Sequence, residues 1–565
     1  MFTEGGRLVK SRTSRWTLCL LTMVVVASLL TACGATPTAQ EVEKVVTEVV
    51  TVPQTVIVPG TPEIIEKVVE VTSTPEPTPL PKGPEGSLHF LMGEPFVSFD
   101  PHNNFVLAQW SIQRNLFDQL VTVDAQGKPL PMLAETWTVL DANTWQLKLR
   151  KDVAFHDGTP FDAKAAKYTV DRLGDPANGL ALSGLWIPCS SEIVDDYTIN
   201  IKSDASFGKL LYALAITDVI KEGDAERSDF AEVPIGTGPF TFVERQGDKI
   251  TVEANMDYWQ GPPKLAEITF EYIPDANVRL TALQTGEAQL IDNLQVDQIA
   301  VVATDPNLRV IQGDTWQTTY IDFRNTTSEF FKKNTEEQNL LIRQALFHAI
   351  DRDTIQKTIL QGLGKVSSGP TTSNLMDFGD FAPYDYNPEK AKELLAQAGY
   401  PDGFSGVTLY TSEGVWPKTK EVAEAVVNYW LAVGVDVKLE VLEVGALVGH
   451  IFDNSGDMIH FGAVITNGDA CGIDGHIYSG EGGTGWYFTG YTSDEANELV
   501  IACRTTMDQE GFLAAAKALD KFVWDNALYI SLFESFQLLG ASANLQGFAP
   551  NPGLVRNLYT ASLTQ

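Results

Sequence analysis

The chain has 565 residues, of which 44% are hydrophobic and 10% aromatic, enough for a large core spread over several domains. Its net charge of −33 argues against nucleic acid and anionic membrane surfaces as partners, because both carry the same sign. The five cysteines contain no CxxC pair and the seven histidines are scattered, so we expect no metal site and no cofactor.

Residues 1–32 have the organisation of a secretory signal peptide. Basic residues from Arg7 to Arg15 precede an apolar run at 16–30, and small residues follow it. Residues 30–33 (LTAC) resemble the lipobox of bacterial lipoproteins, which implies cleavage before Cys33 and its lipidation. The alternative is an uncleaved anchor, since the run reaches the lower length limit of a membrane span. Both interpretations place the rest of the chain outside the cytoplasm.

Residues 33–86 are predicted to form a lipid-anchored tether. The stretch is rich in Pro, Thr, Val and Glu, and it contains no aromatic residue that could build a core. Prolines interrupt helices and sheet ladders and favour extended chain. We therefore expect a stalk that separates a folded body from a membrane, with transient strands in the Val-Glu segments as the alternative.

The folded body begins near Ser87, and strand and helix patterns alternate from there to the C-terminus. Asp162 and Asn387 are suited to cap helices, and Pro388 fits a first helical turn. Gly127 and Gly158 suit hairpin turns. This intermixing predicts a mixed α/β fold. The clearest expected elements are strands at 88–91, 145–149 and 436–444 and helices at 162–173, 387–399 and 418–433.

Eight segments of the body, taken together and in this order, resemble family 5 of the bacterial solute-binding proteins, which serve peptide and nickel ABC importers. The resemblance spans nearly all of residues 87–565. The segments lie at 116–121 (LFDQLV), 124–127 (DAQG), 131–137 (PMLAETW), 149–160 (LRKDVAFHDGTP), 236–240 (GTGPF), 255–259 (NMDYW), 343–352 (RQALFHAIDR) and 387–403 (NPEKAKELLAQAGYPDG).

The resemblance implies a two-lobed periplasmic-binding-protein fold of the α/β, type II, cluster C-like kind. Lobe I is expected at 87–315, with an extra subdomain at about 122–235. Lobe II is expected at 316–526, and residues 527–565 are expected to return to lobe I. Residues 319–323 (TYIDF) and 529–532 (YISL) are expected to be the strands that cross between the lobes.

The same resemblance implies a function in uptake: a monomeric binding protein that closes on a solute, most simply a peptide, and delivers it to an ABC permease with its ATPase subunits. The alternatives are a non-peptide solute, such as an oligosaccharide, an opine or a metal chelate, and a sensor-type receptor lipoprotein. Catalysis has no support, since no GxSxG, HExxH, P-loop or GxGxxG motif occurs in a fitting context.

Relatives contact ligand first from a loop that corresponds here to Asn104, Phe105, Val106 and Leu107. Phe105 and Leu107 could equally be core residues. A further contact is expected near residues 410–417, where Trp416 could stack on a ligand or pack in the core. Trp486, in a glycine-rich segment, is a weaker candidate of the same kind.

The segment 457–469 departs from the pattern of the peptide binders. Those proteins carry a Trp and, three residues later, an Asp that pairs with the amine of the peptide; here the positions are Ala463 and Thr466. A hydroxyl cannot neutralise a buried ammonium. Asp469 is the nearby substitute, although capping the next turn is an equally good role. Thr466 is therefore expected to remove amine recognition at this position.

Three cysteines remain in the body. An oxidising compartment permits one disulfide, and Cys471 and Cys503, which the resemblance places in one lobe, are the preferred pair over Cys189. The alternative is that all three thiols are free.

Overall fold

The computed structural model describes residues 83–564, except 104–105, 377, 414–415, 465–467, 470, 473–490 and 492. The predicted signal peptide, Cys33 and nearly all of the tether lie outside the described residues. Within the described part of the chain, no helix is both long and apolar enough to cross a bilayer.

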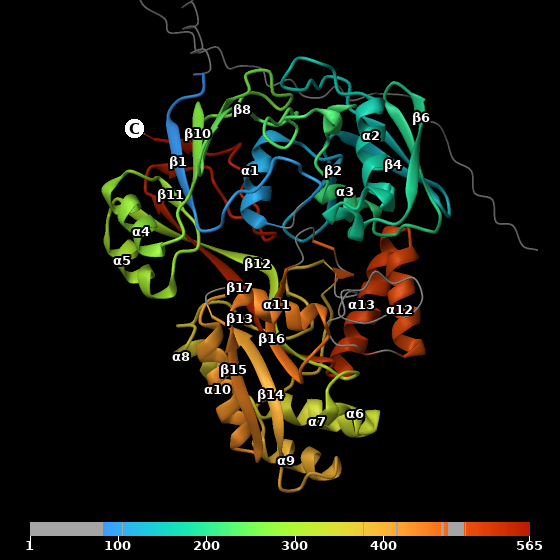
Figure 1. Ribbon diagram of the computed structural model, residues 1–565, viewed down its shortest axis with the longest axis vertical. Helices are drawn as coiled ribbons and strands as arrows, with labels where there is room; N and C mark the ends of the chain where they lie inside the picture. Colours follow the sequence, from blue (N-terminus) through green and yellow to red (C-terminus); the bar gives the residue numbers. More distant parts are fainter. Residues whose placement is uncertain are drawn as a thin grey trace, which may run out of the picture. The chain divides into compact units, whose positions relative to one another are not determined.

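One large mixed sheet organises the described chain (Figure 1). The strand order is β15-β14-β16-β12-β17-β11-β1-β10-β9-β8, with β13 paired to β17. Strands β1, β10 and β11 are parallel, as are β14, β15 and β16. The bounds are β1 (Ser87–Met92), β8 (Phe240–Gln246), β9 (Lys249–Ala254), β10 (Glu267–Tyr272), β11 (Leu290–Ile291), β12 (Leu308–Phe323), β13 (Lys365–Val366), β14 (Phe404–Ser412), β15 (Val435–Leu442), β16 (Met458–Val464) and β17 (Tyr529–Ser542).

Strands β12 and β17 run through both halves of this sheet, and Figure 1 shows them passing from one group of strands to the other. They pair antiparallel from Leu308↔Ser542 to Asp322↔Tyr529, with register shifts after Asp314 and Thr319. One end of this strand pair contributes to the hydrophobic core around β1, and the opposite end contributes to the core around β14. The segments expected to cross therefore lie within two longer strands. We call the elements up to α5 together with the tail after β17 lobe I, and the elements from α6 to α13 lobe II.

In lobe II, α10 packs on β14 and β15 and contributes the fully buried Trp430, whose indole Nε1 donates to the Leu346 carbonyl at 2.9 Å. Helices α12 and α13 pack together around a separate cluster. Asn387 caps its helix as expected, by accepting a hydrogen bond from the Lys390 amide. The helices are α6 (Glu329–Lys332), α7 (Glu336–His348), α8 (Arg352–Thr358), α9 (Pro388–Gln397), α10 (Thr419–Leu431), α11 (Val444–Phe452), α12 (Asp494–Thr505) and α13 (Gln509–Asp525).

Lobe I contains a second sheet, ordered β4-β5-β7-β6, with its own hydrophobic core. Asp162 caps α2 by accepting from the Lys164 and Ala165 amides, as the sequence predicted. In chain order, the β2–β3 hairpin precedes this sheet and the buried helix α3 follows it. The bounds are β2 (Val121–Val123), β3 (Pro129–Pro131), β4 (Ala134–Asp141), β5 (Thr144–Leu149), α2 (Ala163–Gly174), β6 (Cys189–Asp195), β7 (Thr198–Ser203) and α3 (Leu210–Ile216).

The remaining elements of lobe I are α1 (Leu107–Leu116), α4 (Ala276–Thr285), α5 (Ile299–Thr304), β18 (Leu545–Gln546) and β19 (Ser562–Leu563). After β17 the tail packs on α1. The Asn115 side chain donates to the Arg556 carbonyl at 2.9 Å and accepts from the Leu558 amide at 2.8 Å. The last residues of the chain thus complete the core that its first strand begins.

Candidate ligand-binding cleft

The tip of the β2–β3 hairpin reaches lobe II. The Trp316 indole donates to the Ala125 carbonyl at 3.2 Å, and the Met376 amide donates to the Gln126 carbonyl at 3.0 Å. Gly127 has φ +79°, and a Cβ there would lie 2.2 Å from the Gly468 carbonyl oxygen. The two backbones touch, so only glycine fits at the tip.

Replacing Gly127 by Ala is expected to loosen this contact. The side chain adds the strain of a left-handed residue, about 1–2 kcal/mol, and a clash with Gly468. The hydrogen bond of the Met376 amide should then open about ten times more often, which hydrogen exchange measures. Gly158→Ala is the matched control, because Gly158 has φ +83° and a Cβ added there would meet nothing within 4 Å. Equal exchange at Met376 in both variants would contradict the close-approach argument.

A second contact between the lobes is an ion pair. Lys209 Nζ lies 2.6 Å from Asp469 Oδ2, with side chains that are 20% and 3% exposed. Asp469 Oδ1 also accepts from the Cys471 amide at 2.9 Å. The structure therefore shows the capping role considered for Asp469, and it adds a cationic partner from lobe I that the sequence did not indicate.

The same loop of lobe II is covalently fixed. Cys471 and Cys503 form a disulfide, and Cys189 is free. Both bonded cysteines are fully buried in a cluster that also holds Tyr212 of α3 and Phe512 of α13, whose rings stack at 5.3 Å. The disulfide thus fastens the Asp469 loop to α12 at the place where lobe I contacts lobe II.

Trp416 follows β14 and lies against β16. Its indole stands edge-on to Phe461 at 4.5 Å, and a Cβ on Gly462 would approach the ring to 2.8 Å. Thr419 donates to the Trp416 carbonyl at 2.6 Å and holds the turn into α10. Trp416 lines a pocket of lobe II together with His460. Burial lowers the pKa of His460 to about 4, so this ring is neutral at neutral pH.

Glu534 of β17 also lines this pocket and is only 5% exposed. The Ser373 hydroxyl donates to its Oε2 at 2.8 Å. Burial raises the pKa of Glu534. The sequence patterns did not single out this residue, although a lone carboxylate inside the apolar strand ISLFESFQLLG is a signal that could have been used.

Lobe I carries a polar cluster at the carboxyl ends of two parallel strands. Glu94 follows β1 and accepts from the Ala108 amide of α1 at 3.4 Å. Asp292 follows β11 and accepts from the Gly93 amide at 2.7 Å. Burial raises the pKa of both carboxyls and lowers the pKa of the nearby Arg556. Ligands of open α/β sheets bind at such strand ends.

The predicted ligand residues are distributed unevenly. Val106 is the N-cap of α1 and packs against the core around β1, while Leu107 packs against the core of the second sheet. Trp416 and Asp469 lie at the carboxyl ends of β14 and β16. Asn104, Phe105, Thr466 and Trp486 lie outside the described residues.

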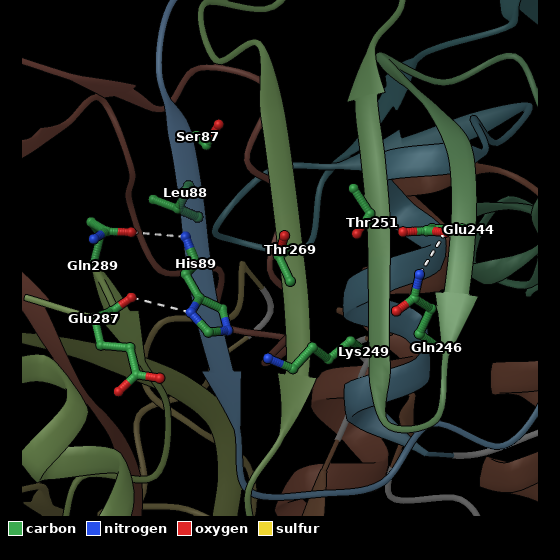
Figure 2. A pocket seen from close by; sticks show the side chains of 10 residues that line it. All are labelled: Ser87, Leu88, His89, Glu244, Gln246, Lys249, Thr251, Thr269, Glu287 and Gln289. Carbon is green, nitrogen blue, oxygen red and sulfur yellow. Dashed lines mark hydrogen bonds between the residues drawn. The ribbon is translucent and has the colours of Figure 1, made fainter.

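A larger hollow, of about 440 Å³, lies over strands β1, β10, β9 and β8 of lobe I (Figure 2). Figure 2 shows the His89 amide bonded to the Gln289 side chain and the His89 ring bonded to the Glu287 carbonyl. Glu271 pairs with both His89 and Lys249. These groups satisfy one another and lie toward the amino end of β1, so the hollow lies away from the carboxyl strand ends that carry Glu94 and Asp292. The described residues contain no cluster of side chains able to hold a metal.

Residues 128–484 match the model of the bacterial extracellular solute-binding proteins, family 5 middle region. The chain therefore belongs to this family, and its predicted place there is confirmed. Its members bind solutes outside the cytoplasm for transport, so the protein is an extracytoplasmic binding protein and not an enzyme.

Two kinds of relative illustrate the similarity. The glutathione-binding protein GsiB of Escherichia coli (strain K12) is 27% identical over 474 residues, covering 81% of this chain and 90% of GsiB. The structure of the ABC transporter substrate-binding protein CtaP from Listeria monocytogenes superposes with a TM-score of 0.75 at 24% identity, covering 86% of this chain and all of CtaP. DppA from Helicobacter pylori, in complex with the peptide STSA, gives 0.69 at 24% identity, with 85% and 98% covered. These structures confirm the predicted two-lobed α/β fold.

Proposed function

We propose that the protein is the receptor of an ABC importer and captures a short peptide or peptide-like solute between its lobes for delivery to the permease. The observation that carries this proposal is the pair of long strands, β12 and β17, that joins two lobes touching again through the hairpin tip and the Lys209–Asp469 ion pair. A cleft connected in this way can open and close around a solute.

The relatives support a peptide-like solute. GsiB is named for glutathione, and DppA was solved with a tetrapeptide. A non-peptide solute is the second candidate, because Ala463 and Thr466 stand where peptide binders of the family carry Trp and Asp. NikZ from Campylobacter jejuni, which has a similar fold at a TM-score of 0.70, was solved with Ni(L-His) and shows that such frameworks hold other cargo.

The proposal includes a lipid anchor at Cys33 and a monomeric body that works with permease and ATPase subunits. The LTAC tetrad after an apolar run and the proline-rich stretch at 34–86 support the anchor. A tether of that composition gives the body reach, so it can meet solute and permease without leaving the membrane.

Calorimetry with glutathione and a series of di- to pentapeptides tests the proposal. After removal of co-purified cargo, checked by native mass spectrometry, we expect at least one member to bind with a Kd of about 1 µM, which corresponds to about −8 kcal/mol. Free amino acids serve as the control and are expected to bind far more weakly. Binding of oligosaccharides or metal chelates but of no peptide would replace the peptide proposal by the second candidate.

A further inference from the structure

Glu534 is a buried acid that makes no direct ion pair among the described residues. The ammonium of Lys365 acts on it from a distance and lowers its pKa, but burial has the larger effect and raises it. Glu534 sits in the middle of β17, where the Ser373 hydroxyl donates a hydrogen bond to its carboxylate. Lys365 of β13 is its direct partner across the strands, but the Lys365 ammonium bonds to Asp314 at 3.0 Å instead. Among the described residues no basic group lies within ion-pair distance of Glu534. A buried charge in this situation is costly unless a counter-charge arrives.

The small pocket beside Glu534 combines aromatic residues with this buried acid. Its lining includes Trp416, Phe533 and Phe536, together with Thr319 and Ser535. Its other titratable residue, His460, is neutral at neutral pH, because burial lowers the pKa of the ring to about 4. Among the described residues of the lining, Glu534 is therefore the one side chain that can carry a negative charge.

The size of the pocket narrows the choice of cation. Its volume is about 20 Å³, room for a single group as large as a water molecule. A primary ammonium has that size, and its three donors match a carboxylate and hydroxyl oxygens. The aromatic rings add attraction for a cation and for the methylene groups that carry it. A guanidinium or a sugar ring is too large.

We propose that this Glu534 pocket takes a primary ammonium group of the bound solute. The inference rests in part on the proposed function and deepens it, because it specifies that the solute group facing lobe II is positively charged. It assigns Glu534 as the recognition residue, Trp416 as the wall of the pocket, and Ser373 as the residue that orients the carboxylate.

The direct test uses a probe whose ammonium group fits the pocket while its short alkyl chain extends out of it. Thermal unfolding is followed with n-butylammonium chloride, with n-butanol, and with sodium chloride at matched ionic strength. We expect the ammonium probe to raise the melting temperature of the wild-type protein by about 2 °C more than the alcohol. This difference should vanish in Glu534→Gln, which keeps the shape of the side chain, and should persist in Glu424→Gln, which removes an exposed carboxylate of α10.

A second readout separates this inference from the peptide proposal. Ala-Ala-Ala, Lys-Ala-Ala and glutathione are titrated in free and amine-acetylated form. We expect the wild-type protein to prefer a free amine by about 30-fold, and Glu534→Gln to reduce the preference below about threefold. If no peptide binds but the butylammonium effect is present, the proposed function fails and the ammonium pocket stands. If butylammonium and butanol act alike on the wild-type protein, or if Glu534→Gln keeps the amine preference, the ammonium pocket is wrong.

Discussion

Replacing Asp469 by Asn is expected to weaken solute binding about 30-fold, which corresponds to about 2 kcal/mol. The carboxylate is nearly fully buried and pairs with Lys209 across the two lobes at 2.6 Å. Removing one partner of such a pair leaves the other charge without compensation, which is where most of the cost arises. Because the ion pair exists only where the lobes touch, its loss reduces the population of the closed form that holds solute. Calorimetry with the tightest-binding peptide of the series measures the effect.

The controls distinguish two roles of Asp469: a contact that stabilises the closed form, and a direct contact with the solute. Lys209→Met keeps the stem of the side chain and should cost about the same as Asp469→Asn, and the double variant should cost no more than either single variant. Asp436→Asn, at an exposed position of β15, should leave binding unchanged. Fully additive losses in the double variant would show that Asp469 contacts the solute itself, as the sequence comparison allowed.

Removing the disulfide is expected to lower the free energy of unfolding by about 3–4 kcal/mol. Cys471 and Cys503 are 32 residues apart, and cross-linking a loop of that length restricts the unfolded chain by an amount of this order. Chemical denaturation of a Cys471→Ser/Cys503→Ser double variant measures the loss. Solute binding should fall as well, because the bond holds the loop of Asp469 at the contact with lobe I.

Cys189→Ser provides the matched control for this substitution. Cys189 is a free and partly exposed residue of β6, and burial raises the pKa of its thiol to about 12, so it is a poor nucleophile for exchange with the disulfide. We expect this variant to lose less than about 1 kcal/mol. If the Cys471→Ser/Cys503→Ser variant and the wild-type protein unfold at the same denaturant midpoint, the disulfide does not stabilise the fold.

Local structure was predictable because its causes are local. Asp162 and Asn387 cap helices at the expected positions, since a side-chain oxygen before an apolar periodic run has few other uses. Gly127 and Gly158 have the positive φ that their turns require. The sequence predicted only short parts of β12 and β17. A strand that runs through two lobes has a different burial pattern in each half, so the pattern of one half does not indicate that the strand continues into the other.

The site was predictable only in part. The sequence placed Trp416 and Asp469 near the ends of strands because the family pattern supplies the order of those strands, and their contact with ligand stays a prediction. Lys209 could not be paired with Asp469, since a long stretch of chain and a lobe boundary separate them. The sequence did not reveal Glu534 because the strand around it has the composition of a core strand. The role proposed for Glu534 depends on two features of the folded chain, namely that Trp416 lines the same pocket and that the Lys365 ammonium bonds to Asp314.

The place of β17 in the sheet has a consequence for how the protein matures. This strand comes late in the chain but lies between β12 and β11, in the interior of the sheet, and the residues after it cover α1. Leu539, Leu545 and Leu558 belong to the core that Leu88 and Phe90 begin. Under the proposed export with the amino end first, this core cannot close until β17 and the residues that follow it have crossed the membrane. We then expect folding to be delayed until that point, and a chain truncated before β17 to remain unfolded.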